Sequence, residues 1–190
     1  DVTKNVADMV LADDNFATIV SAVEEGRRIY DNIRKSIQFL LSSNLSEVMA
    51  IFTANLLGFT ILKPVHLLWI NLVTDCFPAL ALSMEKGEKD LMKRPPRKSS
   101  DGIFAGGVGF DVVYQGLFVT LLTLAAYFIG HFMEAGRWEL TESADGMTMA
   151  FLTMSMCEIF HSFNMRSQHG STVSMLLHGS FNKYIFGSTV

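Results

Sequence analysis

The sequence predicts an all-α membrane protein, a bundle of transmembrane helices that follows a short cytoplasmic strand and stalk. Three observations predict this fold. Apolar residues, 49% of the 190-residue chain, gather in runs long enough to cross a hydrocarbon core of about 30 Å as helices. Polar connections of opposite charge separate these runs. Acids and amides recur inside the runs, where an ionisable group costs several kcal/mol and therefore indicates a functional site.

The composition excludes several classes of protein. The net charge of -4 gives no electrostatic footprint for nucleic acid, so no nucleic-acid partner is expected. Cys76 and Cys157 both lie in apolar runs, and the sequence has no CxxC or Cys/His spacing. Neither a disulfide framework nor a zinc site is therefore expected.

The first 35 residues are polar and charged, and they predict a soluble entry to the membrane region. The apolar run Asp8–Ala12 is predicted to be a strand. From Phe16 onward, apolar residues recur at helical spacing. No proline occurs between Asp1 and Leu62, so one long helix can run from the cytosol into the bilayer and transmit a mechanical signal.

Four apolar runs are predicted to be membrane-spanning helices, and a fifth begins near Phe181. Their approximate bounds are 36–62, 65–84, 104–133 and 147–163, followed by the partial run 181–190. Glycine and proline between the first two runs predict a tight turn, so these spans should be antiparallel neighbours. Pro78 lies inside the second span, shortly after Asp75. Because proline removes a backbone hydrogen bond from a helix, we expect a discontinuous helix at Asn71–Pro78 with free carbonyls beside the carboxylate.

The charges of the connections predict the orientation of the chain. The connection Glu85–Asp101 carries six basic residues, whereas Glu134–Gly146 carries four acids and one arginine. Cytoplasmic loops of membrane proteins carry an excess of Lys and Arg. Residues 1–35 and 85–101 are therefore predicted to be cytoplasmic. Docking of the basic connection against a cytoplasmic domain is the second interpretation of its charge.

A set of polar residues inside the spans forms the candidate ion-binding site: Asn44, Glu47, Asn71, Thr74, Asp75 and Glu158. Within each span they lie three or four residues apart, so each group presents one polar helix face. All can supply oxygen ligands, and no imidazole or thiolate clusters with them. Hard cations such as Ca²⁺ take about six to eight oxygen ligands, whereas Cu⁺ and Zn²⁺ prefer sulfur and nitrogen. The set therefore predicts a site for a hard cation.

Some polar residues of the spans have a plainer interpretation. Isolated polar side chains in membrane helices often form interhelical hydrogen bonds, and this interpretation is as good as a functional one for Ser42, Ser43, Ser46, Thr53, Asn55 and Ser155. Glu47 and Asp75 lie near the middle of their spans, which favours a functional role. Glu158 lies nearer the cytoplasmic end, where its side chain could reach the interface. His161 and Asn164 are interpreted as interfacial residues.

Four strings of this sequence occur in a characteristic order: Ala7–Phe16, Leu41–Glu47, Leu68–Asp75 and Asp90–Arg97. Together they resemble P-type ATPases, above all the calcium-pump branch of the sarco/endoplasmic-reticulum type and its bacterial relatives. Ala7–Phe16, followed by Glu25–Arg27, resembles the end of the family's phosphorylation domain. Leu41–Glu47 resembles the fifth transmembrane helix, and Leu68–Asp75 resembles the sixth. Asp90–Arg97 resembles the cytoplasmic loop that follows. The order and spacing of these strings match nearly the whole chain.

The resemblance implies a domain division and a transported ion. Residues 1–35 would be the end of the phosphorylation domain and the stalk. Residues 36–190 would be the transmembrane cation-binding domain, with helices five to eight and the start of the ninth. The polar set would coordinate Ca²⁺, with Asn44, Glu47, Thr74 and Glu158 in one site, Asn71 in the other and Asp75 in both. Relatives that pump Na⁺ and K⁺ have Asp at the position of Asn71, so Asn71 favours Ca²⁺.

The catalytic motifs of that family are absent from the sequence. It contains no Asp-Lys-Thr-Gly-Thr, Thr-Gly-Glu or Gly-Asp-Gly-x-Asn-Asp string. By this resemblance the chain is a C-terminal fragment that is inactive alone, and only the parent enzyme uses ATP and Mg²⁺. Its partners would be the lipid bilayer and the rest of the pump: helices 1–4, the actuator, nucleotide-binding and phosphorylation domains, and helices 9–10. In a bacterium the membrane would be the plasma membrane.

Two other functions fit part of the sequence. A secondary transporter or channel module also has broken helices and buried acids near the membrane midplane, although the strand and stalk at residues 1–35 argue against it. A nonfunctional fragment of a pump is the other alternative. The predicted function remains part of an ATP-driven pump that removes Ca²⁺ from the cytoplasm through an aspartyl-phosphate cycle.

Overall fold

The computed structural model describes residues 2–13, 15–88, 90–98, 101–167 and 182–189. Within these ranges the protein is all helical and contains no strand, which confirms the predicted fold class. The predicted strand at Asp8–Ala12 is wrong. These residues are irregular and mostly exposed, since a strand needs a partner for its backbone groups and no described segment forms backbone hydrogen bonds with them. A short helix, α1 (Val2–Val6), precedes them.

The longest element is α2 (Phe16–Leu57), which confirms the prediction of one unbroken helix. Asn15 caps its first turn, because its side-chain oxygen accepts a hydrogen bond from the Ala17 N–H at 3.0 Å. Gly58 ends the helix with a φ of 87°, a conformation that glycine adopts without steric cost. The helix therefore stops before residue 62, where the apolar run ends. Its 42 residues extend about 63 Å, roughly twice the thickness of the hydrocarbon core.

The second span is helical throughout and contains a change of hydrogen-bond register. It consists of α3 (Pro64–Trp69), a π-helix η1 (Ile70–Asp75) and α4 (Cys76–Ser83). The predicted interruption is thus corrected: the backbone widens into a π-helix, in which the Cys76 N–H donates to the Asn71 carbonyl, and it does not unwind. Pro78 has no N–H to donate one turn back. A π-helical turn changes the backbone hydrogen bonds locally from i→i−4 to i→i−5, and such turns are frequent at functional sites.

The third and fourth spans are α5 (Val108–Ala135) and α6 (Ala144–Asn164), which pack against each other. Glycines allow their close approach, since a Cβ added to Gly130 would lie 2.8 Å from the Cα of Gly146. Three helical segments are long and apolar enough to cross a membrane: Phe16–Leu57, Pro64–Ser83 and Ala105–Ala135. The 21-residue α6 is not among them, because its polar residues lower its mean hydropathy.

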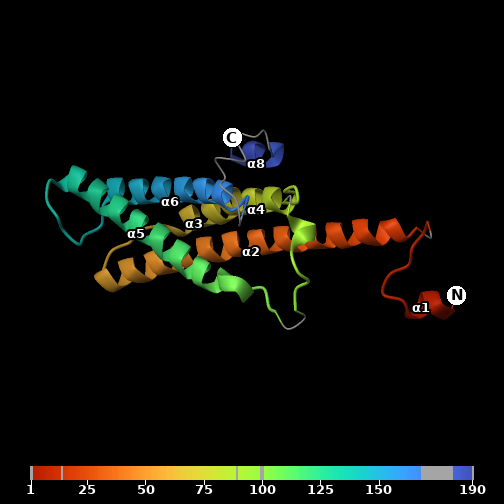
Figure 1. Ribbon diagram of the computed structural model, residues 1–190. Helices are drawn as coiled ribbons and strands as arrows, with labels where there is room; N and C mark the ends of the chain where they lie inside the picture. Colours follow the sequence, from red (N-terminus) through yellow and green to blue (C-terminus); the bar gives the residue numbers. More distant parts are fainter. Residues whose placement is uncertain (1, 14, 89, 99–100, 168–181, 190) are drawn as a thin grey trace.

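Figure 1 shows α2 as the long axis of the bundle, with α3 and α4 running back beside it and α5 crossing it obliquely. The first two spans are thus antiparallel neighbours, as predicted. The connection from α4 to α5 contains two short 3₁₀ turns, η2 (Leu91–Lys93) and η3 (Ala105–Gly107). The last described element, α8 (Lys183–Thr189), packs on α4.

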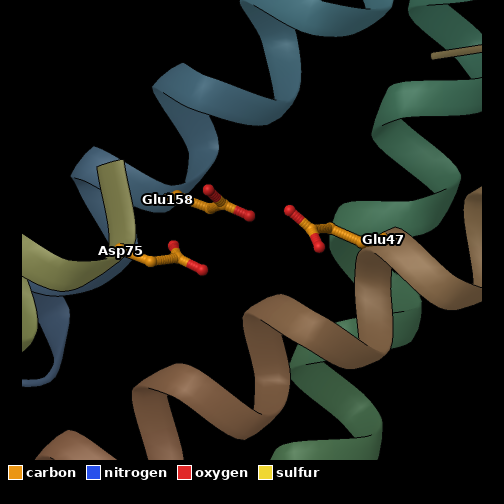
Figure 2. Close-up of side chains that lie close together, drawn as sticks. All are labelled: Glu47, Asp75 and Glu158. Atoms are coloured by element: carbon orange, nitrogen blue, oxygen red, sulfur yellow. The ribbon is translucent and has the colours of Figure 1, made fainter. Parts of the chain in front are cut away.

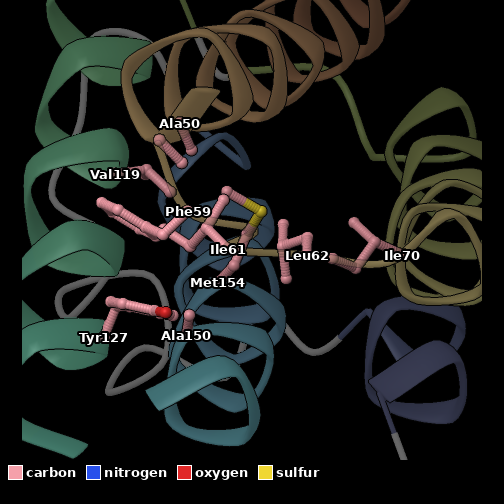
Figure 3. Close-up of a cluster of buried hydrophobic side chains, with 10 residues drawn as sticks. Ala50, Phe59, Ile61, Leu62, Ile70, Val119, Tyr127, Ala150 and Met154 are labelled. Carbon is pink, nitrogen blue, oxygen red and sulfur yellow. The ribbon is translucent and has the colours of Figure 1, made fainter. Parts of the chain in front are cut away.

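An apolar core closes the end of the bundle where α2 turns into α3 (Figure 3). Phe59, in that turn, stacks on Tyr127 of α5 with ring centroids 4.5 Å apart. Ala50 of α2 and Met154 of α6 are fully buried in the same core. This packing fixes α2, α5 and α6 relative to one another on one side of the polar residues.

A buried charged network ties the helices together at the other end. Arg166, which follows α6, donates to both carboxylate oxygens of Glu85 at 3.2 and 3.1 Å, and both side chains are buried. Lys35 of α2 donates to the Arg166 carbonyl at 2.9 Å. Asn182, next to α8, donates to Glu85 Oε2 at 2.6 Å. The polar residues of the spans thus lie between an apolar core and a charged network.

Candidate cation site

Three carboxylates from three helical elements converge inside the bundle (Figure 2). Glu47 comes from α2, Asp75 from the end of η1 and Glu158 from α6. One carboxylate oxygen of each lies within 4.8 Å of the others, and all three side chains are buried. We call these three residues the carboxylate trio. Like charges this close and this buried are unfavourable unless a cation or bound protons neutralise them.

Ser43 connects two members of the trio. It lies one helical turn before Glu47, and its Oγ lies 2.8 Å from Asp75 Oδ1 and 2.5 Å from Glu158 Oε1. A hydroxyl has a single proton and can donate to only one acceptor at a time. The second contact therefore needs a proton on the carboxyl group, which would then donate to the hydroxyl oxygen, or a shared cation.

Thr74 and Asn71 extend the oxygen-rich surface from η1. Thr74 Oγ1 lies 3.0 Å from Glu158 Oε2 and 2.9 Å from the Ile70 carbonyl. The Asn71 amide donates to both Glu47 oxygens, at 2.9 and 2.8 Å, and to the Leu67 carbonyl at 3.0 Å. The π-helix therefore carries Asp75 of the trio and places two further predicted site residues, Asn71 and Thr74, beside the other two carboxylates.

Asn44 is the one predicted site residue that does not join this arrangement. Its side chain is exposed, and its amide donates to the Leu40 carbonyl of its own helix at 2.8 Å. It forms no hydrogen bond with the described trio residues. Their spacing along α2 predicted that Asn44 and Glu47 share one helix face. Only the part of that face with Glu47 contacts η1 and α6.

The donor chemistry of the trio fits a hard cation. Asp75 Oδ2 is buried and has no hydrogen-bond partner among the described residues, so an oxygen with a negative charge is left for another ligand. The described side chains that hydrogen-bond to the trio are the Ser43 and Thr74 hydroxyls and the Asn71 amide. Such donors suit Ca²⁺ or a similar ion and not a soft metal. The arrangement can therefore hold a cation between α2, η1 and α6.

Ser43 was underestimated from the sequence, where interhelical hydrogen bonding and function weighed equally. The signal for it was its spacing, since Ser43 lies four residues before Glu47 and so on the same helix face. Ser42 has the plainer role, with its Oγ 2.9 Å from His161 Nε2. His161 forms no hydrogen bond to the described trio residues.

Comparison with known proteins decides the family. Residues 59–190 match the protein family described as "Cation transporting ATPase, C-terminus". The chain belongs to this family of cation-transporting ATPases. It is an integral membrane protein, and it matches the C-terminal transmembrane region of these P-type pumps.

Three of its relatives are calcium-transporting ATPases. Calcium-transporting ATPase 1 of Bacillus cereus is 45% identical over 97% of this chain and 22% of its own length. The calcium-transporting ATPase of Bacillus subtilis is 40% identical over 100% of this chain and 21% of its own length. Calcium-transporting ATPase 3, endoplasmic reticulum-type, of Arabidopsis thaliana is 42% identical over 92% of this chain and 17% of its own length. The chain thus spans about a fifth of the length of these relatives.

Proposed function

We propose that this chain provides most of the ion-binding site of an ATP-driven pump that moves Ca²⁺ out of the cytoplasm. The observation that carries the proposal is the carboxylate trio, three buried acids from three helices with oxygens within 4.8 Å of one another. Buried oxygen ligands bind a hard cation, and the relatives are calcium-transporting ATPases. This family assignment favours a pump over a secondary transporter or channel.

In this proposal the six predicted residues contribute differently to ion binding. Glu47, Asp75 and Glu158 provide the charge, and Thr74 provides a hydroxyl oxygen beside Glu158. Asn71 would turn its amide so that the oxygen faces the ion. Asn44, which is exposed in the described chain, would contribute only after its amide leaves the Leu40 carbonyl.

ATP, Mg²⁺ and the aspartyl-phosphate would belong to the remainder of the pump, together with helices 1–4 and 9–10. The unbroken α2 would link that chemistry to the ion. It carries Ser43 and Glu47 at membrane depth, and its first half extends beyond the apolar region. A displacement of this stalk would therefore move two site residues directly. The membrane would be the plasma membrane in a bacterial host.

The proposal is tested on the full-length pump with Glu47→Gln, Asp75→Asn and Glu158→Gln, each of which removes one charge and keeps the shape. Calcium uptake into vesicles and Ca²⁺-dependent labelling of the enzyme by radioactive ATP are measured together. We expect both to be lost at Ca²⁺ concentrations that saturate the parent. Glu139→Gln, in the connection between α5 and α6, is the matched control. Undiminished uptake in all three variants would refute the assignment.

A further inference from the structure

A separate cavity lies between the stalk part of α2 and the connection that follows α4. Its volume is about 580 Å³. Four arginines line it, Arg27, Arg34, Arg94 and Arg97, and we call it the arginine pocket. Leu91 and Pro95 add apolar surface to the same lining. None of these residues belongs to the candidate cation site.

Within the described ranges, one of the four arginines forms ion pairs with acids. Arg94 forms ion pairs with Asp31 at 2.9 Å, Asp90 at 2.7 Å and Glu88 at 2.5 Å. The ion pairs of the described residues include none for Arg27, Arg34 or Arg97. The pocket lining also includes one carboxylate, Asp31, which pairs with Arg94. The charges of Arg27, Arg34 and Arg97 therefore face the cavity without an ion-pair partner among the described residues.

The other contacts of these three arginines hold them in place and leave their charge available. Arg27 Nη1 donates to the Leu91 and Arg94 carbonyls at 3.1 and 2.8 Å. The Arg97 guanidinium lies over the Tyr30 ring, 3.7 Å from its centroid. Arg34 donates to a backbone carbonyl, and its Nε is buried with no hydrogen-bond partner among the described residues. A guanidinium has five N–H donors, so each has donors to spare for an anion.

The position of the pocket along α2 places it at the membrane surface. Arg34 lies just before the apolar run that begins near residue 36. Arg27 lies about 10 Å farther along the helix on the side away from that run. The headgroup layer on each side of a bilayer is roughly 5–8 Å thick. The pocket thus begins at headgroup depth and opens outward from it.

We propose that the arginine pocket binds the phosphate of an anionic phospholipid headgroup. Planar guanidinium groups match phosphate oxygens and can bind two of them at once. Basic pockets beside transmembrane helices are suited to anionic headgroups, and Leu91 and Pro95 offer apolar contact for the adjoining glycerol. A soluble phosphate compound shares this chemistry, so the test separates the two sources. The proposal does not depend on which ion the pump carries.

The test uses the full-length pump in mild detergent and counts bound lipids by native mass spectrometry. Phosphatidylglycerol is compared with phosphatidylcholine, and glycerol 3-phosphate serves as the soluble phosphate. The variants are Arg27→Gln/Arg34→Gln/Arg97→Gln together and Arg97→Gln alone, which leaves the backbone contacts of Arg27 and Arg34 intact. Arg28→Gln, in the same helix and outside the pocket lining, is the matched control.

We expect phosphatidylglycerol to be retained over phosphatidylcholine, with about fivefold weaker retention in Arg97→Gln. The triple variant should lose the bound lipid, and Arg28→Gln should keep it. Should the triple variant fail to fold, Arg97→Gln decides alone. Equal retention in every variant would overturn the proposal. So would binding of glycerol 3-phosphate without lipid preference, or reduced activity with an unchanged lipid count, which would indicate that another domain docks there.

Discussion

The Asn71 amide donates to both carboxylate oxygens of Glu47, at 2.9 and 2.8 Å. One amide thus spans the two oxygens of the acid that α2 contributes to the trio. The nitrogen faces the carboxylate in this arrangement, and the oxygen is free to face an ion only after the amide turns. Asn71 therefore holds Glu47 in place and is also a potential ligand.

Asn71→Leu removes both the hydrogen bonds to Glu47 and the potential ligand oxygen. If Asn71 is a ligand and holds Glu47, its removal should weaken Ca²⁺ binding about tenfold or more, since hydrogen bonds to charged groups contribute about 1.5–3 kcal/mol. The Ca²⁺ dependence of phosphorylation in the full-length pump measures this. Asn55→Leu, at an exposed position of α2, should leave the dependence unchanged. A higher Ca²⁺ affinity in Asn71→Leu would show that Asn71 only competes with the ion for Glu47.

Ser43→Ala tests the bridge between Asp75 and Glu158. Without the hydroxyl the two carboxylates lose a common partner and repel each other more strongly. We expect about tenfold weaker Ca²⁺ binding, because Asp75 Oδ1 loses its hydrogen-bond donor and the site loses one oxygen. Ser46→Ala is the control, since among the described residues Ser46 Oγ bonds only to the Ser43 carbonyl, at 2.7 Å. Equal effects of the two substitutions would argue against a special role for Ser43.

The close packing of α5 against α6 predicts that one added methyl group lowers the stability of the protein. In Gly130→Ala the new Cβ would meet the backbone of Gly146 at 2.8 Å, so the helices must separate. We expect a loss of roughly 1–3 kcal/mol from such overpacking, seen as a lower unfolding temperature of the full-length protein. Gly109→Ala, also in α5, has its nearest contact at 3.9 Å and should be neutral or slightly stabilising. No difference between the two would contradict the described crossing.

Removing one partner of the Glu85–Arg166 ion pair should lower stability much more than replacing both partners with apolar residues. Glu85→Gln leaves the buried Arg166 without its carboxylate and should cost about 3–5 kcal/mol of stability. The double substitution Glu85→Leu/Arg166→Met should recover most of that loss, because no uncompensated charge remains. Thermal unfolding of the purified pump measures both. The exposed pair of Arg137 and Glu139 is the control, and Glu139→Gln should change stability by less than about 0.5 kcal/mol.

Hydropathy and helical spacing were enough to predict the helices and the acids that meet. Glu47, Asp75 and Glu158 stand out because charge inside an apolar run is costly, whatever the packing around it. The π-helix at Ile70–Asp75 could not be predicted in the same way. Pro78 indicated a disturbed helix, but whether the backbone unwinds or widens depends on neighbouring helices that local sequence does not specify.

The other features that the sequence did not predict also depend on contacts between distant segments. Glu85 and Arg166 lie 81 positions apart, so nothing local connects them. Asn44 and Ser43 are adjacent, yet only Ser43 reaches the trio, because a residue on a polar face contacts a ligand only where another helix meets that face. The strand predicted at Asp8–Ala12 shows the same dependence, since a strand forms only with a partner.

Direct measurement of Ca²⁺ binding tests the central claim, that the carboxylate trio holds the transported ion. Equilibrium binding of radioactive calcium to the full-length pump, without ATP, is compared for the parent, Asp75→Asn and the control Glu139→Gln. We expect the parent and the control to bind the same amount of Ca²⁺. Asp75→Asn should lose all specific binding, because Asp75 Oδ2 has no hydrogen-bond partner in the described part of the chain and is available to the ion. Binding by Asp75→Asn equal to that of the parent would contradict the account.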